Sequence, residues 1–388
     1  RKTGYKGLTS QYNLPYGLGE TEVKYETTQV SLGNTYFNHP SNQSNPGSMC
    51  LQNSSIGTAA RYWRWLLTFN HFSGRPFVNT EHNHAFLNRY QHEGGILFGA
   101  YSAFQNFSGI TAFTHAAILK AYRNDSWSIG ANPVARANEF LSACLYLRKD
   151  VKASPHLISL EIGKKYLESK CRSAMGVSAD DNQFALLSGM AVSFPWADRP
   201  KGTANPRKPD MVLIPSKGAA LKIADWAVEL DEKSNGADNK IDVCIKAMKA
   251  KGILSSTNLS DPSKGIYHSD TEEITLRAKE NLLKVATPKS EAVSIEAGKS
   301  ETINCLEVLT SSVPACIAAC AMDNSDLKDS SRIVLIFSTE VVNTEMELSG
   351  DGVELKNLGR LPILMRTGKL QAKLQNANAS QLQLYALG

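Results

Sequence analysis

A short run of polar side chains follows a predicted buried strand at residues 76–80. This run contains Glu81, His82, Asn83 and His84. Because side chains alternate along a strand, Glu81 and Asn83 are expected on one side and the two histidines on the other. A carboxylate at the C-terminal end of a parallel strand is suited to act as a nucleophile or to transfer protons. Glu81 is therefore a candidate catalytic residue; the alternative is a structural Glu that a helix N-terminus or an arginine satisfies.

Aromatic and imidazole side chains follow the neighbouring predicted strands. Tyr36 and His39 come just after a strand predicted at 29–34, where they are suited to orient a carboxylate or to bind sugar hydroxyls. Phe113 and His115 stand at the end of the next predicted strand, and aromatic residues there either stack on sugar faces or line a barrel. The residues expected to contact substrate are Asn34, His39, Asn83, His84, Phe113, His115 and the loop residue Trp196.

The first 151 residues alternate strand-like runs with amphipathic stretches. This alternation predicts β/α units around a parallel sheet. Pro133 behind Asn132 marks a helix start, because proline is favoured in the first helical turn. The expected strands are 7–12, 29–34, 76–80 and 110–114, and the expected helices are 57–69, 94–104 and 133–147.

Two further regions complete the expected fold, which is α/β plus all-β. Residues 152–264 are rich in Gly, Pro, Lys and Asp, and they are interpreted as an elaborated connector or barrel extension. From 265 to 388, short apolar runs between turn residues predict an antiparallel β-sandwich domain. The strands expected there are 274–277, 282–286, 292–295, 331–337, 352–358 and 382–386.

Four of these segments together resemble the second half of a clan A (β/α)8-barrel glycoside hydrolase. They are residues 34–40, 75–83, 99–105 and 107–110, and the resemblance is most specific around Glu81. It implies a portion of a (β/α)8 (TIM) barrel over 1–151, followed by the β-sandwich. It also implies a retaining hydrolase of oligosaccharides or polysaccharides, with Glu81 as the strand 7 nucleophile. Tyr36 falls where the family often has an aromatic residue after strand 6 that contacts the nucleophile.

The sequence departs from this family because it lacks a second catalytic carboxyl group, the acid/base, at the expected position. Retaining hydrolysis needs an acid/base group about 5–5.5 Å from the nucleophile, and in the family an Asn-Glu pair at the end of strand 4 supplies it. Here the only such pair, Asn138-Glu139, falls in a predicted helix. Only four barrel strands, interpreted as strands 5–8, precede the sandwich, and the chain opens at Arg1 without an initiator Met. We therefore expect a preceding segment, a companion chain or a homo-oligomeric partner to complete the barrel.

Composition excludes several classes of protein. The chain has 388 residues, of which 42% are hydrophobic and 20% charged, with a formal net charge of +5. These values are typical of a globular protein. No run of about 18 uncharged apolar residues is present, so we expect no membrane span. The interspersed charges do not indicate a nucleic-acid partner. The seven cysteines form no zinc motif, and we expect buried thiols with one or two disulfides.

Alternative functions have less support in the sequence. A metal site at His82, His84, His92 and Glu81 lacks an H-E-x-x-H motif and divides its ligands between two faces of a strand. Neither a G-x-S-x-G elbow nor a phosphate-binding loop is present, and we expect no cofactor and no bound metal. The alternative from another class is a non-catalytic saccharide-binding or structural protein on a degenerate barrel. For an enzyme that degrades polysaccharides, a secreted, periplasmic or cell-surface location is expected.

Overall fold

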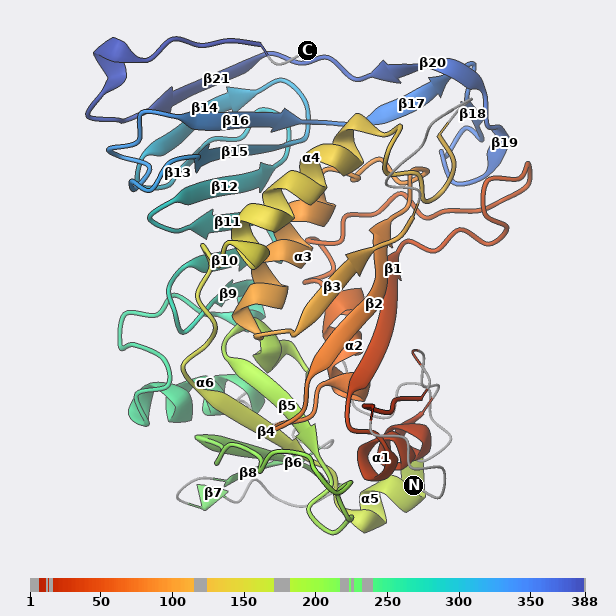
Figure 1. The fold of residues 1–388 in the computed structure, drawn as a ribbon, viewed down its shortest axis with the longest axis vertical. Helices are drawn as coiled ribbons and strands as arrows, with labels where there is room; N and C mark the ends of the chain where they lie inside the picture. Colours follow the sequence, from red (N-terminus) through yellow and green to blue (C-terminus); the bar gives the residue numbers. More distant parts are fainter. Residues whose placement is uncertain are drawn as a thin grey trace.

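Parallel β/α units make up the N-terminal part of the chain, as predicted (Figure 1). Strands β1 (Ser31–Phe37), β2 (Phe77–His84) and β3 (Gly109–Ala112) form a parallel sheet in that order. Helix α1 (Leu18–Thr27) precedes β1, and helices α2 (Arg61–Asn70) and α3 (Glu93–Phe104) connect the strands. The computed structural model describes residues 7–11, 13, 17–114, 124–170, 182–216, 223–224, 227–231 and 240–386.

The strand expected at 7–12 is not found in its described part, residues 7–11. This segment nevertheless runs beside the start of β1. The Thr9 carbonyl accepts hydrogen bonds from the Gln29 and Val30 backbone N–H groups, and the Asn13 carbonyl accepts one from Asn34. Because these hydrogen bonds are made only at Thr9 and Asn13, they do not form the regular series of backbone bonds that defines a β-strand pair. Within the described residues the sheet ends at β1 on one side and at β3 on the other, so no closed barrel forms there.

The predicted helices are confirmed, and the third is capped as its sequence indicates. Helix α4 (Pro133–Ser142) continues into a π-helical segment, η1 (Ala143–Leu147). The Asn132 side chain accepts hydrogen bonds from the backbone N–H groups of Val134 and Ala135. Helices α3 and α4 pack so closely that a Cβ atom on Gly95 would lie only 2.5 Å from the Asn138 Cα atom. The absence of a side chain at Gly95 therefore permits this contact.

A second, mostly parallel sheet occupies much of the region that was expected to be a connector. Its strands pair in the order β5-β4-β6-β8-β7, and only the β7–β8 pair is antiparallel. The strands are β4 (Leu157–Glu161), β5 (Gly189–Ser193), β6 (Met211–Ser216), β7 (Ile223–Ala224) and β8 (Ala227–Asp231). Its helices are α5 (Lys164–Lys170), η2 (Gln183–Leu186) and α6 (Lys240–Ala250).

The C-terminal region is mainly antiparallel, as predicted. A six-stranded sheet has the order β16-β15-β12-β11-β10-β9, and a three-stranded sheet has the order β13-β14-β21. The six strands are β9 (Ile266–His268), β10 (Ile274–Arg277), β11 (Leu282–Ala286), β12 (Ser290–Ile295), β15 (Ala315–Ala321) and β16 (Ile333–Ser338). The three strands are β13 (Glu301–Thr302), β14 (Leu306–Ser311) and β21 (Leu370–Leu374).

Short ribbons and single helical turns complete this region. Strand β17 (Val341–Thr344) pairs with β20 (Arg360–Met365), and β18 (Glu347–Leu348) pairs with β19 (Leu355–Asn357). The prediction of a strand at 382–386 is wrong. These residues are irregular, most of them are exposed, and they pair with no strand among the described residues. The short 3-10 turns are η3 (Pro262–Lys264), η4 (Ala278–Glu280) and η5 (Ala379–Gln381).

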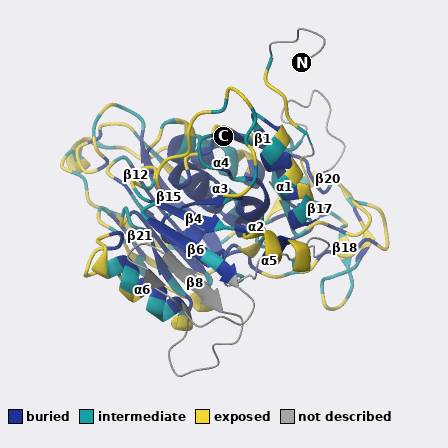
Figure 2. Cartoon of the chain, turned by 90° about the horizontal axis from the view of Figure 1, so that it is seen from below, coloured by how far each residue is buried: buried dark blue, intermediate teal, exposed yellow. Residues whose placement is uncertain are grey.

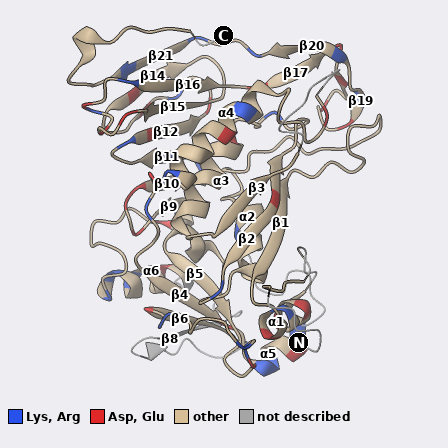
Figure 3. Cartoon of the chain, viewed as in Figure 1, with Lys and Arg blue, Asp and Glu red and all other residues tan. Residues whose placement is uncertain are grey.

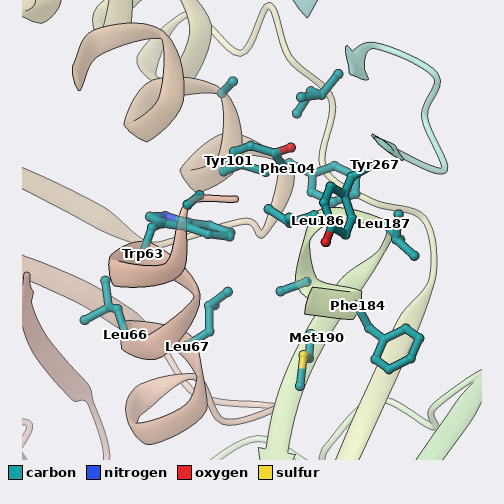
Figure 4. Packing of buried hydrophobic residues seen from close by; sticks show 14 of the residues in the cluster. Trp63, Leu66, Leu67, Tyr101, Phe104, Phe184, Leu186, Leu187, Met190 and Tyr267 are labelled. Carbon is teal, nitrogen blue, oxygen red and sulfur yellow. The ribbon is translucent and has the colours of Figure 1, made fainter. Parts of the chain in front are cut away.

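A continuous apolar core joins these parts. Figure 4 shows Trp63 of α2 and Tyr101 of α3 near Leu186, Met190 and Tyr267, which belong to η2, β5 and β9. The six-stranded sheet buries one face against this core, and its other face packs on the three-stranded sheet. Figure 2 shows the resulting pattern, with the central helices and strands buried and the exposed residues on peripheral loops and on outer helices such as α5. No helix among the described residues is long and apolar enough to cross a membrane.

Candidate functional site

The candidate site lies at the C-terminal ends of β1 and β2. The parallel register sets Asn34 opposite Glu81 and Tyr36 opposite Asn83. Glu81 is the only Asp, Glu, Lys or Arg on strands β1, β2 and β3, all of which are described, and these strands are correspondingly almost uncoloured in Figure 3. A single carboxylate therefore stands on an otherwise uncharged sheet.

The Tyr36 hydroxyl donates a hydrogen bond to Glu81 Oε2. Burial, the hydrogen bond to the carboxylate and its negative charge all raise the pKa of Tyr36 above its ordinary value. The phenol is therefore neutral and remains a donor at physiological pH. A neutral donor aimed at one carboxylate oxygen fixes the orientation of the carboxylate and leaves its other oxygen available to react.

Rings surround Tyr36 on several sides. Its ring centroid lies 4.6 Å from that of Trp127, 6.0 Å from that of Phe113 and 5.6 Å from that of His39. The Trp127 indole N–H donates to Gln43 Oε1 at 2.5 Å, which fixes the plane of the indole. Together these rings form an aromatic wall beside Glu81, in which Trp127 is buried and Tyr36 and Phe113 are partly exposed.

The two asparagines expected to bind sugar hydroxyls hold the backbone and a neighbouring side chain in place. Asn83 Nδ2 donates to the carbonyls of Phe113 and Trp127, so it joins the two segments that carry the aromatic wall. Asn34 Oδ1 accepts a 2.5 Å hydrogen bond from Thr80 Oγ1. Asn34 is buried, whereas Asn83 is partly exposed. His39 is exposed, with its Nδ1 atom 2.9 Å from the Pro40 carbonyl oxygen.

His84 does not join this cluster. Its ring is buried between Phe37 and Tyr62, and its Nε2 atom lies 3.0 Å from Ser55 Oγ. Burial, followed by the neighbouring His92 and His82, lowers the pKa of His84 to about 3. The expectation that His84 binds a sugar hydroxyl is therefore corrected: strand alternation turns it away from Glu81 and into the interior.

The metal alternative finds no support in the described residues. His82 stacks on Phe98 with ring centroids 3.7 Å apart, which occupies the face of its ring. Within the described parts of the chain, no group of three or more His, Cys, Asp and Glu side chains is arranged to hold a metal ion.

Trp196 lies far from the site, at the other end of the sheet. Trp196 follows β5, and Val192 of β5 forms a β-bridge with Phe72, which precedes the start of β2. Glu81 lies in the second half of β2, toward the opposite end of the strand. The Trp196 indole N–H donates to the Ile162 carbonyl at 2.9 Å. The structure therefore does not bring Trp196, which was expected to contact substrate, to the site at Glu81, because the loop that carries it packs on the second sheet. His115 lies outside the described residues.

Trp127 and Gln43 are site residues that the sequence interpretation missed. Trp127 lies in a turn in which Asp125 Oδ1 accepts hydrogen bonds from the Trp127 backbone N–H and from the Ser128 hydroxyl. The stretch D-S-W-S has the signature of such an Asx turn, and it is the one local signal that could have drawn attention to Trp127. Gln43 has no comparable signal, because only the fold brings it to the indole.

The Asn138-Glu139 pair makes no hydrogen bond to Glu81, but it lines a cavity together with His82, Asn83 and His84 of β2. Both residues lie in α4, where Asn138 Nδ2 donates to the Gln91 carbonyl at 2.7 Å and Glu139 pairs with Arg136 at 3.0 Å.

Comparisons with protein-family models, with curated proteins and with solved structures found no match to this chain. Its function is therefore inferred from the geometry around Glu81.

Proposed function

We propose that this chain carries the nucleophile of a retaining glycoside hydrolase that acts on an oligosaccharide or polysaccharide. The observation that carries the proposal is the hydrogen bond from Tyr36 to Glu81 at the ends of two adjacent parallel strands. Glu81 would attack the anomeric carbon through its free oxygen and form a glycosyl-enzyme intermediate. Tyr36 would position Glu81 through the hydrogen bond to Oε2.

The proposed substrate-binding surface is the partly exposed side of the aromatic wall, formed by Phe113 and Tyr36, with the buried Trp127 packed behind them. A sugar bound at Glu81 would place an apolar face on these rings, since aromatic side chains offer large contact area at low entropic cost. The exposed His39 imidazole lies at the edge of the wall and is suited to hydrogen-bond a sugar hydroxyl.

The proposal includes a fold in which β1, β2 and β3 belong to a (β/α)8 barrel and the C-terminal sheets form a β-sandwich. The acid/base carboxyl group and the remaining strands would come from a segment outside this sequence, from a companion chain or from a second copy. Two features support a missing neighbour. Strand β3 has no partner on its outer edge among the described residues, and a cavity of about 180 Å³ is lined by β2, β3, α3, α4 and η1. An unpaired strand edge is a template for another strand.

A non-catalytic saccharide-binding protein is the second candidate. The same aromatic wall supports it, because stacking on a sugar requires no acid/base group. The two candidates differ in whether Glu81 forms a covalent bond.

Covalent trapping tests the proposal without requiring the acid/base group. In 2-deoxy-2-fluoroglycosyl fluorides, fluoride leaves without protonation, and the fluorine at C2 slows hydrolysis of the intermediate. The full chain is incubated with a panel of these reagents that differ in sugar configuration, and the products are weighed as intact proteins. We expect one reagent to add a single glycosyl group, on the proteolytic peptide that contains Glu81.

Two variants make the test specific. Glu81→Gln should abolish the adduct, because an amide is not nucleophilic enough to replace the carboxylate. Glu139→Gln is the matched control and should react as the wild type does, since Glu139 lies in α4 and pairs with Arg136. A lack of adduct with every reagent would overturn the proposal, and retention of the chain on immobilised polysaccharide would then favour the binding protein.

A further inference from the structure

A cavity lies between the parallel sheet and the helices packed on it (Figure 1). It has a volume of about 180 Å³. Most of its wall is formed by aliphatic side chains from β3, the loop after it, α4 and η1, namely Ile110, Ala112, Ile129, Ala135, Ala143 and Leu147. Leu147 is 72% exposed, so it marks a side on which the cavity meets solvent. An apolar cavity of about 150 Å³ holds a molecule of the size of benzene, and this cavity therefore has room for a substituted ring.

The polar part of the lining includes His84 of β2. His84 is only 8% exposed, and its ring lines the cavity. Its Nε2 atom lies 3.0 Å from Ser55 Oγ, whereas its Nδ1 atom has no hydrogen-bond partner among the described residues. A Cβ atom on Gly94, which also lines the cavity, would lie 3.0 Å from His84 Nδ1. The absence of a side chain at Gly94 therefore leaves this nitrogen uncovered.

Hydrogen bonds behind His84 determine which of its ring nitrogens carries the proton. The Ser55 hydroxyl donates to Glu93 Oε2 at 2.6 Å, and Glu93 is buried. Because a hydroxyl has one proton to donate, the Ser55 oxygen must accept the hydrogen bond that it shares with His84 Nε2. Nε2 is therefore the protonated nitrogen. Nδ1 keeps its lone pair, and it can accept a hydrogen bond from a molecule in the cavity.

The lining of the cavity is close to neutral. Burial is the main reason why the pKa values of His82 and His84 are both lowered to about 3, so neither imidazole is charged at neutral pH. Glu139 is the one other ionisable carboxylate or cation among the described lining residues, and it pairs with Arg136 at 3.0 Å. Burying an ion without a partner of opposite charge is costly. An uncharged ligand therefore fits this cavity better than an anion or a cation.

We propose that this cavity binds a small neutral molecule with an apolar ring and one hydroxyl group, such as a phenol. The ring would lie against the aliphatic wall, and the hydroxyl group would donate a hydrogen bond to His84 Nδ1. The inference is independent of the proposed function, because strand alternation turns His84 away from Glu81. A strand paired with the outer edge of β3 would lie in the plane of the sheet, so it would leave the space between the sheet and the helices available.

The test compares three ligands of similar size on the full chain at pH 7. Phenol can donate a hydrogen bond, anisole carries an oxygen but cannot donate, and toluene has neither property. Ligand-observed NMR titrations give the dissociation constants. We expect phenol to bind with a dissociation constant of about 1 mM or lower. Anisole and toluene should bind about 10-fold more weakly, because each would leave the buried His84 acceptor without a donor.

Variants place the ligand in the cavity. His84→Phe should remove the preference for phenol, because it keeps a ring of similar shape but lacks the acceptor. Ala143→Phe should fill the cavity and weaken the binding of phenol by at least about 10-fold. Ala379→Phe is the matched control, since Ala379 is exposed in η5, and it should bind phenol as the wild type does.

The melting temperature of each variant without ligand shows whether it folds. If a variant does not fold, the comparison of the three ligands on the wild type still decides the question. The inference would be overturned by equal affinities for phenol, anisole and toluene, by a lack of binding of all three, or by phenol binding that survives in a folded Ala143→Phe variant.

Discussion

Tyr36 and Glu81 are hydrogen-bonded across two adjacent parallel strands, with the phenol as donor and the carboxylate as acceptor. Trp127, Phe113 and His39 pack around the tyrosine ring, so this pair sits in an aromatic setting. This relationship gives Glu81 a fixed orientation and leads to the first prediction.

Tyr36→Phe should slow the covalent labelling of Glu81 by about 10- to 100-fold. A hydrogen bond to a charged group contributes about 1.5–3 kcal/mol, and the carboxylate would lose its orienting donor. The measurement is the rate constant for adduct formation with the 2-fluoro reagent that labels the wild type. Tyr146→Phe is the control, because the Tyr146 hydroxyl donates to the Phe107 carbonyl away from the site. An unchanged labelling rate in Tyr36→Phe would remove the tyrosine from the mechanism.

Asn83→Ala should destabilise the fold by about 1–3 kcal/mol, because two carbonyls that Asn83 now satisfies would lose their donor. Asn83→Asp should cost more than this, since a carboxylate would face the carbonyls of Phe113 and Trp127. Urea unfolding at neutral pH measures the free energy of unfolding. Asn45→Ala serves as the exposed control and should change stability by less than about 0.5 kcal/mol. Equal stabilities of the Asn83 variants and the control would contradict the bridging role.

Glu93→Gln should lower the free energy of unfolding by about 2–3 kcal/mol. Glu93 is fully buried at the start of α3, and it accepts hydrogen bonds from the Ser54 and Ser55 hydroxyls and from the backbone N–H groups of Ser55 and Ile56. An amide nitrogen in place of one oxygen would leave a buried donor without an acceptor. Thermal and urea unfolding check the loss. Stability equal to that of the wild type would show that the segment before α2 tolerates the change.

His84→Gln should make the fold less sensitive to acid. Burial lowers the pKa of His84 to about 3, below the ordinary value of 6.5. Between these two values the unfolded chain binds a proton that the folded chain does not, so the contribution of His84 to stability is present above pH 6.5 and is lost as the pH falls toward 3. The slope is at most about 1.4 kcal/mol per pH unit for one group.

Urea unfolding of the wild type and of His84→Gln at pH 4, 5, 6 and 7 separates this contribution. Glutamine can still hydrogen-bond Ser55 but does not titrate. We expect the free energy of unfolding of the wild type to fall relative to that of His84→Gln as the pH is lowered. The variant should therefore compare least favourably with the wild type at pH 7 and most favourably at pH 4. A constant difference across this range would show that the pKa of His84 is the same in the folded and the unfolded chain, as expected for an exposed imidazole.

Several elements and the central pair of the site follow from the sequence alone. Apolar residues at helical spacing predict α2 and α3, and Asn132 before Pro133 predicts the start of α4. Local spacing is sufficient here because each element needs only its own apolar face and its own cap. Strand alternation likewise separates Glu81 from the histidines beside it, which is a property of one strand.

Tertiary structure decided which of these side chains meet. Trp127, Gln43 and Tyr36 lie in separate loops and strands, and their contacts depend on how the chain returns to the sheet. Trp196 also lies in a loop, yet this loop packs at the other end of the sheet. Sequence spacing determines local periodicity and caps, whereas the burial of apolar faces against one another determines which distant residues come together.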